Sequence, residues 1–173
     1  CDVILKMQDN ADETSVIFNE YCTSWGKPTQ EKMLSYCENL KDLGIKYAVI
    51  DAGWCNGGKD QAANGEWNVD KNAFPDIKYM TDKMRSMGII PGIWFEFEVT
   101  TKGSKLYEPK YDFMKLKDDS KVINIGNFRT FWDFRRDDVK ELLYKRVIEF
   151  IKKNGFGYIK VDYNGNVGMF ADG

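Results

Sequence analysis

The sequence contains no histidine among its 173 residues. Ser-His and Cys-His catalytic pairs, HExxH metalloproteases and histidine-based zinc sites all need an imidazole, so these classes are excluded. Catalytic chemistry must then depend on carboxylates, lysine, cysteine or tyrosine. The 27 Asp and Glu residues make carboxylates the first candidates.

Cysteine is also scarce, with Cys1, Cys22, Cys37 and Cys55 as the four examples. They form no C-x-x-C pair and show no zinc-ligand spacing, so we predict free, buried thiols in a reducing compartment. No secretory signal is recognisable, which favours a cytoplasmic protein. The sequence starts without an initiator methionine, so we expect it to be part of a longer protein. No apolar run approaches the ~18 residues of a membrane helix, and no membrane partner is expected.

Excess positive charge is missing as well. The 25 Lys and Arg residues nearly balance the 27 acidic ones, and the net charge is −2. This provides no basic field for a phosphate backbone, so we expect no nucleic-acid partner. The length and the 43% of hydrophobic residues indicate one globular domain with a sizeable core.

A repeated unit organises the chain. Three times, a helical pattern ends at a glycine, where a left-handed residue is favoured, and a short apolar run then ends at a carboxylate. The three glycine and carboxylate pairs are Gly44 with Asp51, Gly88 with Glu96, and Gly155 with Asp162. The last unit follows one long helical pattern over residues 139–151. An earlier apolar run at 16–21 predicts a strand before the first helix, which Thr29 would cap.

Strands that alternate with helices predict a parallel sheet covered by helices. An open doubly wound sheet and a (β/α)8 barrel both satisfy this pattern, and polar residues at the strand ends favour the TIM-type barrel. A complete barrel needs ~250 residues, so about four βα units are expected here. We therefore predict a partial (β/α)8 catalytic domain over 16–173, preceded by a connector or the tail of another domain at 1–15. Residues 103–129 are predicted to form a long loop with a short helix.

The strand ends carry the candidate site. Because side chains alternate along a strand, Lys160, Asp162 and Asn164 share one face. A paired lysine would keep Asp162 ionised, as a carboxylate nucleophile requires. The alternative is a structural ion pair at the end of a strand.

Asp51 and Glu96 add two further carboxylates at strand ends. Either one alone is more often a loop-capping acid than a ligand-binding residue. Three such carboxylates with tryptophans nearby are typical of a sugar pocket, because carboxylates bind hydroxyl groups and aromatic rings stack on C–H surfaces.

Two apparent motifs are rejected. Residues 53–60 imitate a phosphate-binding loop, but Asp60 occupies the Ser/Thr position and no helical pattern follows. Residues 162–173 begin like a calcium loop, but Val167 replaces the required glycine and Gly173 replaces the final glutamate. We therefore expect no metal site.

Five segments together resemble glycoside hydrolase family 36, the retaining α-galactosidase or melibiase family, whose catalytic domain is a (β/α)8 barrel. These segments are 18–21, 49–54, 92–98, 132–134 and 159–164. The resemblance implies that Asp162 is the catalytic nucleophile and that Lys160 binds sugar hydroxyls beside it. It further implies that Trp94 forms the wall of the galactose subsite.

By the same resemblance, Asp51 binds the galactose 4- and 6-hydroxyls with Trp54 as its neighbour, while Asn164 lines the pocket. Arg129 is matched to a sugar-binding arginine, and the strand-end carboxylate Glu96 is also assigned to the substrate site. Two positions depart from the family pattern. Ala52 replaces the second residue of an Asp-Asp pair, and Phe97 replaces a proline. The family's general acid/base is an aspartate on a later strand, outside this sequence.

We therefore predict the N-terminal half of an α-galactosidase barrel that acts on α-galactoside oligosaccharides by double displacement, without a cofactor. The isolated chain is expected to be inactive, and the full-length protein to form a homo-oligomer. Two alternatives stay open. The first is a related α-glycosidase or transglycosidase of the same clan, which the departure at Ala52 supports. The second is a non-catalytic carbohydrate-binding half-barrel, which would bind sugar without hydrolysing it.

Overall fold

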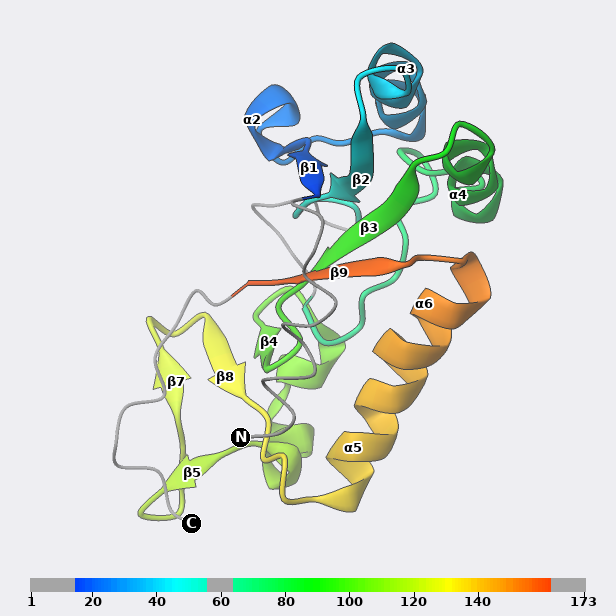
Figure 1. Ribbon diagram of the computed structural model, residues 1–173. Coiled ribbons are helices and arrows are strands. Elements are labelled where there is room, and N and C mark those ends of the chain that lie inside the picture. Colours follow the sequence, from blue (N-terminus) through cyan, green and yellow to red (C-terminus); the bar gives the residue numbers. More distant parts are fainter. Residues whose placement is uncertain (1–14, 56–63, 163–173) are drawn as a thin grey trace.

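The computed structural model describes residues 15–55 and 64–162 (Figure 1). Its main sheet has four strands, β1 (Val16–Asn19), β2 (Ile45–Ile50), β3 (Ile90–Phe95) and β9 (Tyr158–Val161). They lie in the order β1-β2-β3-β9, and every neighbouring pair is parallel. A doubly wound sheet reverses its strand order at a switch point, whereas a barrel adds strands in sequence order. The sheet therefore has the order of a partial barrel, as predicted.

Helices connect the strands. They are α2 (Tyr21–Ser24), α3 (Gln30–Leu40), α4 (Ile77–Ser86), α5 (Asp137–Leu143), the π-helical turn η3 (Tyr144–Ile148) and α6 (Glu149–Asn154). In Figure 1, α3 and α4 lie beside the β2–β3 part of the sheet, and α5 to α6 run alongside β9. The last three segments form the predicted long helix, but its π-helical turn was not predicted.

The local signals in the sequence act as expected. The Thr29 hydroxyl accepts a hydrogen bond from the Lys32 backbone N–H at 3.2 Å and caps α3. Gly44, Gly88 and Gly155 adopt φ values of 71°, 78° and 72°, the left-handed conformation in which a side chain is disfavoured. Each glycine thus turns the chain from a helix into the next strand.

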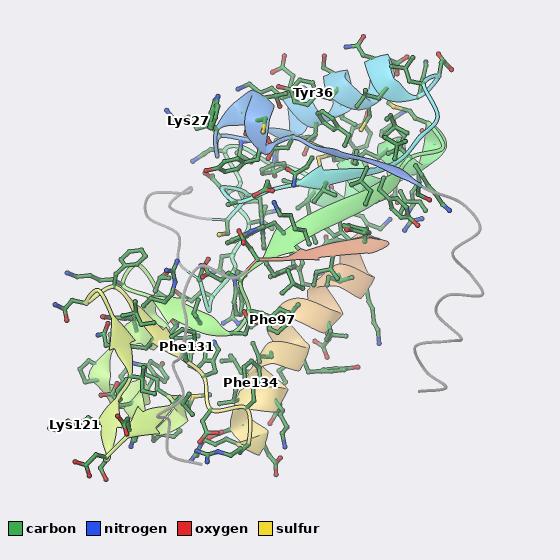
Figure 2. All side chains as sticks on the ribbon, turned by 60° about the vertical axis from the view of Figure 1, so that its left-hand side comes forward. Lys27, Tyr36, Phe97, Lys121, Phe131 and Phe134 are labelled. Carbon is green, nitrogen blue, oxygen red and sulfur yellow. The ribbon has the colours of Figure 1, made fainter. Side chains whose placement is uncertain are left out.

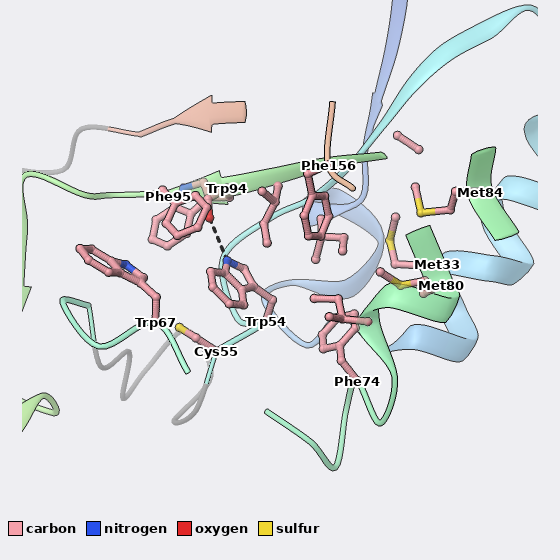
Figure 3. Packing of buried hydrophobic residues seen from close by; sticks show 14 of the residues in the cluster. Met33, Trp54, Cys55, Trp67, Phe74, Met80, Met84, Trp94, Phe95 and Phe156 are labelled. Carbon is pink, nitrogen blue, oxygen red and sulfur yellow. Dashed lines mark hydrogen bonds between the residues drawn. The ribbon is translucent and has the colours of Figure 1, made fainter. Parts of the chain in front are cut away.

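The core lies between the sheet and its helices (Figure 3). Met33 of α3 packs with Met80 and Met84 of α4 at one end of this cluster. Elsewhere in this cluster, the Trp54 ring stacks on Phe150 with centroids 5.2 Å apart. Burying methionine and aromatic side chains provides most of the driving force that holds helices on a sheet.

The cysteine prediction is only partly right. Cys37 and Cys55 are buried free thiols, and burial raises their pKa values to about 11 and about 12. Cys22 is also free but exposed, because it lies on α2 at the surface. Cys1 lies outside the described residues.

Residues 99–131 form a separate layer beyond β3. They contain β4 (Val99–Thr101), η1 (Lys105–Tyr107), η2 (Pro109–Met114), β5 (Lys117–Asp118), β6 (Lys121–Val122), β7 (Asn124–Ile125) and β8 (Arg129–Phe131). The predicted long loop is thus more ordered than expected. The buried Lys115 ammonium donates to the Tyr107 carbonyl and to Asp112 Oδ1, both at 2.7 Å, and so ties the two short 3-10 helices together.

The last strand of the sheet is less well covered. Ile159 and Val161 of β9 are 37% and 48% exposed. A groove of about 300 Å³ lies beside Ile159 and is lined by Phe97, Phe134 and the α5–η3 segment, and Figure 2 shows Phe97 and Phe134 near one another beside this helical segment. Within the described part of the chain, no helix combines the length and apolar character needed to cross a bilayer.

Candidate active site

The predicted polar residues gather where the parallel strands end. Asn19 is the last residue of β1, Asp51 follows β2, Glu96 follows β3 and Asp162 follows β9. Because the carboxyl ends of parallel strands meet at one edge, these four side chains share one edge of the sheet. The strand-end carboxylates of the repeated unit thus lie along one edge of the sheet.

Asp51 is the centre of one cluster. Its Oδ2 atom pairs with the Lys160 ammonium at 2.5 Å and accepts a hydrogen bond from Asn19 Nδ2 at 2.7 Å. Its Oδ1 atom accepts from the Ala52 backbone N–H at 2.7 Å. The carboxylate is nearly buried, at 2% exposure, while the Lys160 side chain keeps 35% of its surface exposed. The buried charge is therefore compensated, and its cation still reaches solvent.

The partner of Lys160 differs from the prediction. The sequence suggested a pair with Asp162, two residues along the same strand, but the ion pair is with Asp51, across β3. Lys160 lies opposite Trp94 in the β3–β9 register, and its long side chain reaches past that strand to the end of β2. Inter-strand register, which spacing within one strand does not reveal, determines this contact.

Glu20 binds the Asp51 backbone and was not predicted as a site residue. Its Oε1 atom accepts a hydrogen bond from the Asp51 backbone N–H at 3.0 Å, and the side chain is fully buried. Burial raises the pKa of Glu20, because the charged form loses its hydration. The sequence placed Glu20 inside a strand, whereas β1 ends one residue earlier. The signal available in the sequence was an acid near the end of an apolar run.

Asp162 is held by Trp94. The Asp162 backbone N–H donates to the Phe95 carbonyl at 2.9 Å, which continues the β3–β9 ladder beyond the strand. The Trp94 indole N–H then donates to Asp162 Oδ2, also at 2.9 Å. A hydrogen bond to the ionised carboxylate stabilises that form and fixes its direction. Trp94 itself is 3% exposed.

Trp54 has a supporting position. Its indole N–H donates to the Trp94 carbonyl at 2.8 Å, the dashed line in Figure 3. The side chain is 0% exposed and packs between Phe95 and Phe150, so it has no surface with which to touch a sugar. Trp54, which the family resemblance sets beside Asp51 in the substrate site, thus helps to fix the strand that carries Trp94.

Glu96 forms a second cluster with Arg129. Arg129 Nε lies 3.0 Å from Glu96 Oε1, and its Nη2 donates to Oε2 at 3.2 Å, a two-point contact. Asn64, which sequence reasoning missed, donates from Nδ2 to the same Oε2 at 2.9 Å. Glu96 is 2% exposed and the Arg129 side chain 17%. Two residues assigned separately to the substrate thus bind each other.

Several predictions fall outside the described residues. Asn164 is the substrate-site residue concerned. The rejected calcium loop beyond Asp162 and most of the rejected phosphate loop, including Asp60, also lie there.

The described arrangement can bind a polyhydroxylated ligand. It combines the Lys160 ammonium and the Asp51 carboxylate with the Asp162 carboxylate, which an indole orients. Groups of this kind both donate to and accept from hydroxyls.

Comparisons with known proteins show which family the chain resembles. A family model described as Melibiase matches residues 2–172. The α-galactosidase Mel36A of Lactobacillus acidophilus is 24% identical over 151 residues, covering 86% of this chain and 20% of that protein.

Solved structures are similar too. The crystal structure of the glycoside hydrolase family 36 α-galactosidase AgaB from Geobacillus stearothermophilus superposes with a TM-score of 0.81 at 22% identity, covering 92% of this chain and 22% of that one. A variant of AgaA from the same organism, crystallised with raffinose, gives a TM-score of 0.77 at 22% identity, covering 87% and 21%. The chain therefore spans about a fifth of the length of these proteins.

Proposed function

The chain belongs to the melibiase family, and from that premise we propose that the full-length protein hydrolyses terminal α-galactosides with retention of configuration, using Asp162 as the nucleophile. The observation that carries the proposal is the Asp162 carboxylate, which follows β9 and accepts the Trp94 indole N–H at 2.9 Å. It is placed at the sheet edge where barrel enzymes carry their active sites.

The reaction takes two displacements. An Asp162 oxygen attacks the anomeric carbon, the bond to the leaving oxygen breaks, and a second carboxylic acid protonates that oxygen. Water then attacks the anomeric carbon, the second carboxylate takes the proton of the water, and the bond to Asp162 breaks. The second carboxylate stands ~5–5.5 Å from the nucleophile in retaining enzymes. We assign that role to no residue of this chain.

The other strand-end groups suit the bound galactose. Lys160 carries ammonium donors at 35% exposure, and Asp51 beside it provides acceptor oxygens. The family resemblance assigns hydroxyl contacts to both, and the 2.5 Å ion pair between them fixes their relative position. The raffinose complex of AgaA supports an α-galactoside oligosaccharide as the substrate class.

Ala52 favours a second candidate, a related α-glycosidase or transglycosidase. The family commonly has a second aspartate at this position, and here only the backbone N–H of Ala52 contributes, as donor to Asp51 Oδ1. One hydroxyl acceptor is therefore absent. A panel of aryl α-glycosides separates the two candidates, because an α-galactosidase cleaves the α-galactoside far faster than the α-glucoside or α-xyloside.

Replacing the nucleophile tests the proposal. In the full-length protein, Asp162→Asn keeps the shape of the side chain but removes its charge, so turnover of α-galactosides should fall more than about 10³-fold. Asp82→Asn, at an exposed position on α4, is the matched control and should retain wild-type activity. More than a few per cent of residual activity in Asp162→Asn would reject the assignment of Asp162.

A chemical rescue distinguishes a nucleophile from a merely structural carboxylate. Asp162→Ala leaves room for azide, which should attack the anomeric carbon of α-galactosyl fluoride directly. The expected product is β-galactosyl azide, formed with inversion as fluoride leaves. If azide restores no turnover in a folded Asp162→Ala protein, another residue performs the first displacement.

A further inference from the structure

Trp25 is the exception among the tryptophans. Trp54, Trp67, Trp94 and Trp132 are each 3% exposed or less, whereas Trp25 is 64% exposed, more than any other aromatic residue in the described ranges. An indole buries more apolar area than almost any other side chain when it enters a core, so this exposure forgoes a large stabilisation. A single exposed apolar side chain is common on protein surfaces, so a binding role for Trp25 needs support from its backbone and its neighbours.

The backbone at Trp25 is unfavourable too. Trp25 ends α2 with φ of 51° and ψ of 43°, and its N–H donates to the Tyr21 carbonyl at 2.7 Å. This left-handed conformation normally selects glycine or asparagine, because a Cβ atom costs ~1–2 kcal/mol there. A glycine at this position would avoid the backbone cost. The tryptophan side chain therefore does not stabilise the left-handed turn at position 25.

Short contacts connect Trp25 to the candidate active site. The Tyr21 backbone N–H donates to Asn19 Oδ1 at 3.0 Å, and Asn19 Nδ2 donates to Asp51 Oδ2 at 2.7 Å. The edge of the Tyr21 ring meets Trp25 with centroids 6.0 Å apart. Two aromatic rings thus stand together in the segment that directly follows β1, at the sheet edge that carries Asp51.

A second connection comes from the next turn. A Cβ atom built on Gly53 would lie 2.3 Å from the carbonyl oxygen of Gly26, so the two backbones are in direct contact. Gly26 follows Trp25, and Gly53 lies two residues after Asp51. Figure 2 labels Lys27, which marks this turn after α2. The Trp25 turn therefore packs on the loop that connects Asp51 to Trp54.

We propose that Trp25, with Tyr21 at its edge, is a stacking platform for the sugar residue attached to the terminal galactose. The proposal rests on the function proposed above. The charged groups of Asp51, Lys160 and Asp162 suit the hydroxyls and anomeric carbon of the terminal sugar, whereas Trp25 offers an exposed aromatic ring. The face of an indole is electron-rich and packs on the weakly positive C–H face of a pyranose. Trp25 would thereby favour oligosaccharides over simple galactosides.

Two substrates that differ only beyond the galactose test this. Raffinose has a sugar ring next to the galactose, whereas α-galactosyl fluoride has none. In the full-length protein, Trp25→Ala should lower kcat/KM for raffinose about fivefold to tenfold, mainly through KM, as expected when one aromatic contact is lost. It should leave kcat/KM for α-galactosyl fluoride unchanged. Trp25→Tyr, which keeps a ring, should restore part of the raffinose activity.

Further variants guard against a folding effect. Trp25→Gly suits the left-handed backbone, so it should match or exceed the wild-type thermal stability while showing the same selective loss on raffinose. Tyr79→Ala removes an aromatic ring that is 49% exposed on α4 and should change neither substrate.

Each remaining outcome rejects the platform. Equal losses on both substrates would mean that Trp25 acts on the fold or the catalytic step. No loss on either substrate would mean that Trp25 faces something other than substrate, such as a second copy of the protein. If the wild type cleaves neither substrate, the proposed function fails and the platform fails with it. If it cleaves both and Trp25→Ala is not selective, only the platform fails.

Discussion

The Asp51–Lys160 pair and the Glu96–Arg129 pair both place a carboxylate at 2% exposure after a strand of the same sheet. Their cations differ. The Lys160 side chain is 35% exposed and contacts Asp51 through its single ammonium group. The Arg129 side chain is 17% exposed and contacts Glu96 through two nitrogen atoms. A lysine ammonium is a compact charge with rotatable donors, and a guanidinium is a rigid planar fork. The first pair is thus suited to meet a ligand, and the second to hold a loop on the sheet.

The surroundings of the two pairs strengthen this contrast. Asp51 has a second buried acid beside it, Glu20, whose pKa is raised by burial. Each carboxylate also accepts a hydrogen bond from an asparagine amide, Asp51 from Asn19 at 2.7 Å and Glu96 from Asn64 at 2.9 Å. Asn64 and Arg129 come from segments beyond the parallel sheet, so the Glu96 cluster joins the β4–β8 layer to β3.

The largest effect is expected at the exposed cation. Lys160→Met in the full-length protein should lower kcat/KM for α-galactosides about 10³-fold, since it removes a ligand contact and leaves Asp51 without its counter-charge. Lys78→Met, at an exposed i,i+4 pair on α4, is the matched control and should have wild-type kinetics. A near-normal kcat/KM in Lys160→Met would contradict the claim that the Asp51–Lys160 pair contacts the ligand.

A smaller effect, and mainly on stability, is expected at the enclosed pair. Glu96→Gln removes the charge that pairs with Arg129 and should lower the free energy of unfolding by about 3 kcal/mol, measured by urea titration. Glu141→Gln, whose carboxylate pairs with Lys145 at the surface, should change it by less than about 0.5 kcal/mol. If Glu96→Gln is as stable as Glu141→Gln, the Glu96 pair does not hold the layer in place.

The smallest effect concerns Glu20 and appears only as a pH dependence. Its folded-state pKa is raised above the ordinary value of 4.5, so the folded state binds the proton more tightly than the unfolded state. The stability from protonated Glu20 is complete below that ordinary value and is lost as pH rises through the folded-state pKa. Glu20→Gln stays neutral, so it should gain stability relative to wild type as the pH rises from the ordinary value of 4.5 through the folded-state pKa of Glu20.

Urea unfolding of both proteins across that range measures the difference. The Gln side chain can still accept the Asp51 N–H through its Oε1 atom, which isolates the effect of charge. A stability difference that does not vary with pH would show that Glu20 is not a destabilising buried acid.

Much of the fold follows from local rules in the sequence. Gly44, Gly88 and Gly155 each end a helical pattern, and the apolar runs after them form strands, because a left-handed residue and a continuous apolar run are local properties. These signals also locate Asp51, Glu96 and Asp162 at one edge. The π-helical turn at Tyr144–Ile148 has no comparable local signal.

The pairing within the site could not be predicted in the same way. Lys160 binds Asp51 across 109 positions of sequence, and Arg129 binds Glu96 from a different layer. Such partners depend on strand register, side-chain reach and the path of a loop. The buried Glu20 was misplaced for a related reason, since the end of β1 depends on where pairing with β2 stops.

The identity of the nucleophile is the central claim, and trapping the covalent intermediate tests it most directly. A 5-fluoro-α-galactosyl fluoride should react with the full-length protein, release fluoride and leave the fluorinated sugar bonded to an enzyme carboxylate, because the ring fluorine slows hydrolysis of the intermediate. Digestion and mass spectrometry should locate the added sugar on Asp162. The same adduct on Asp51, Glu96 or any other carboxylate would contradict the account.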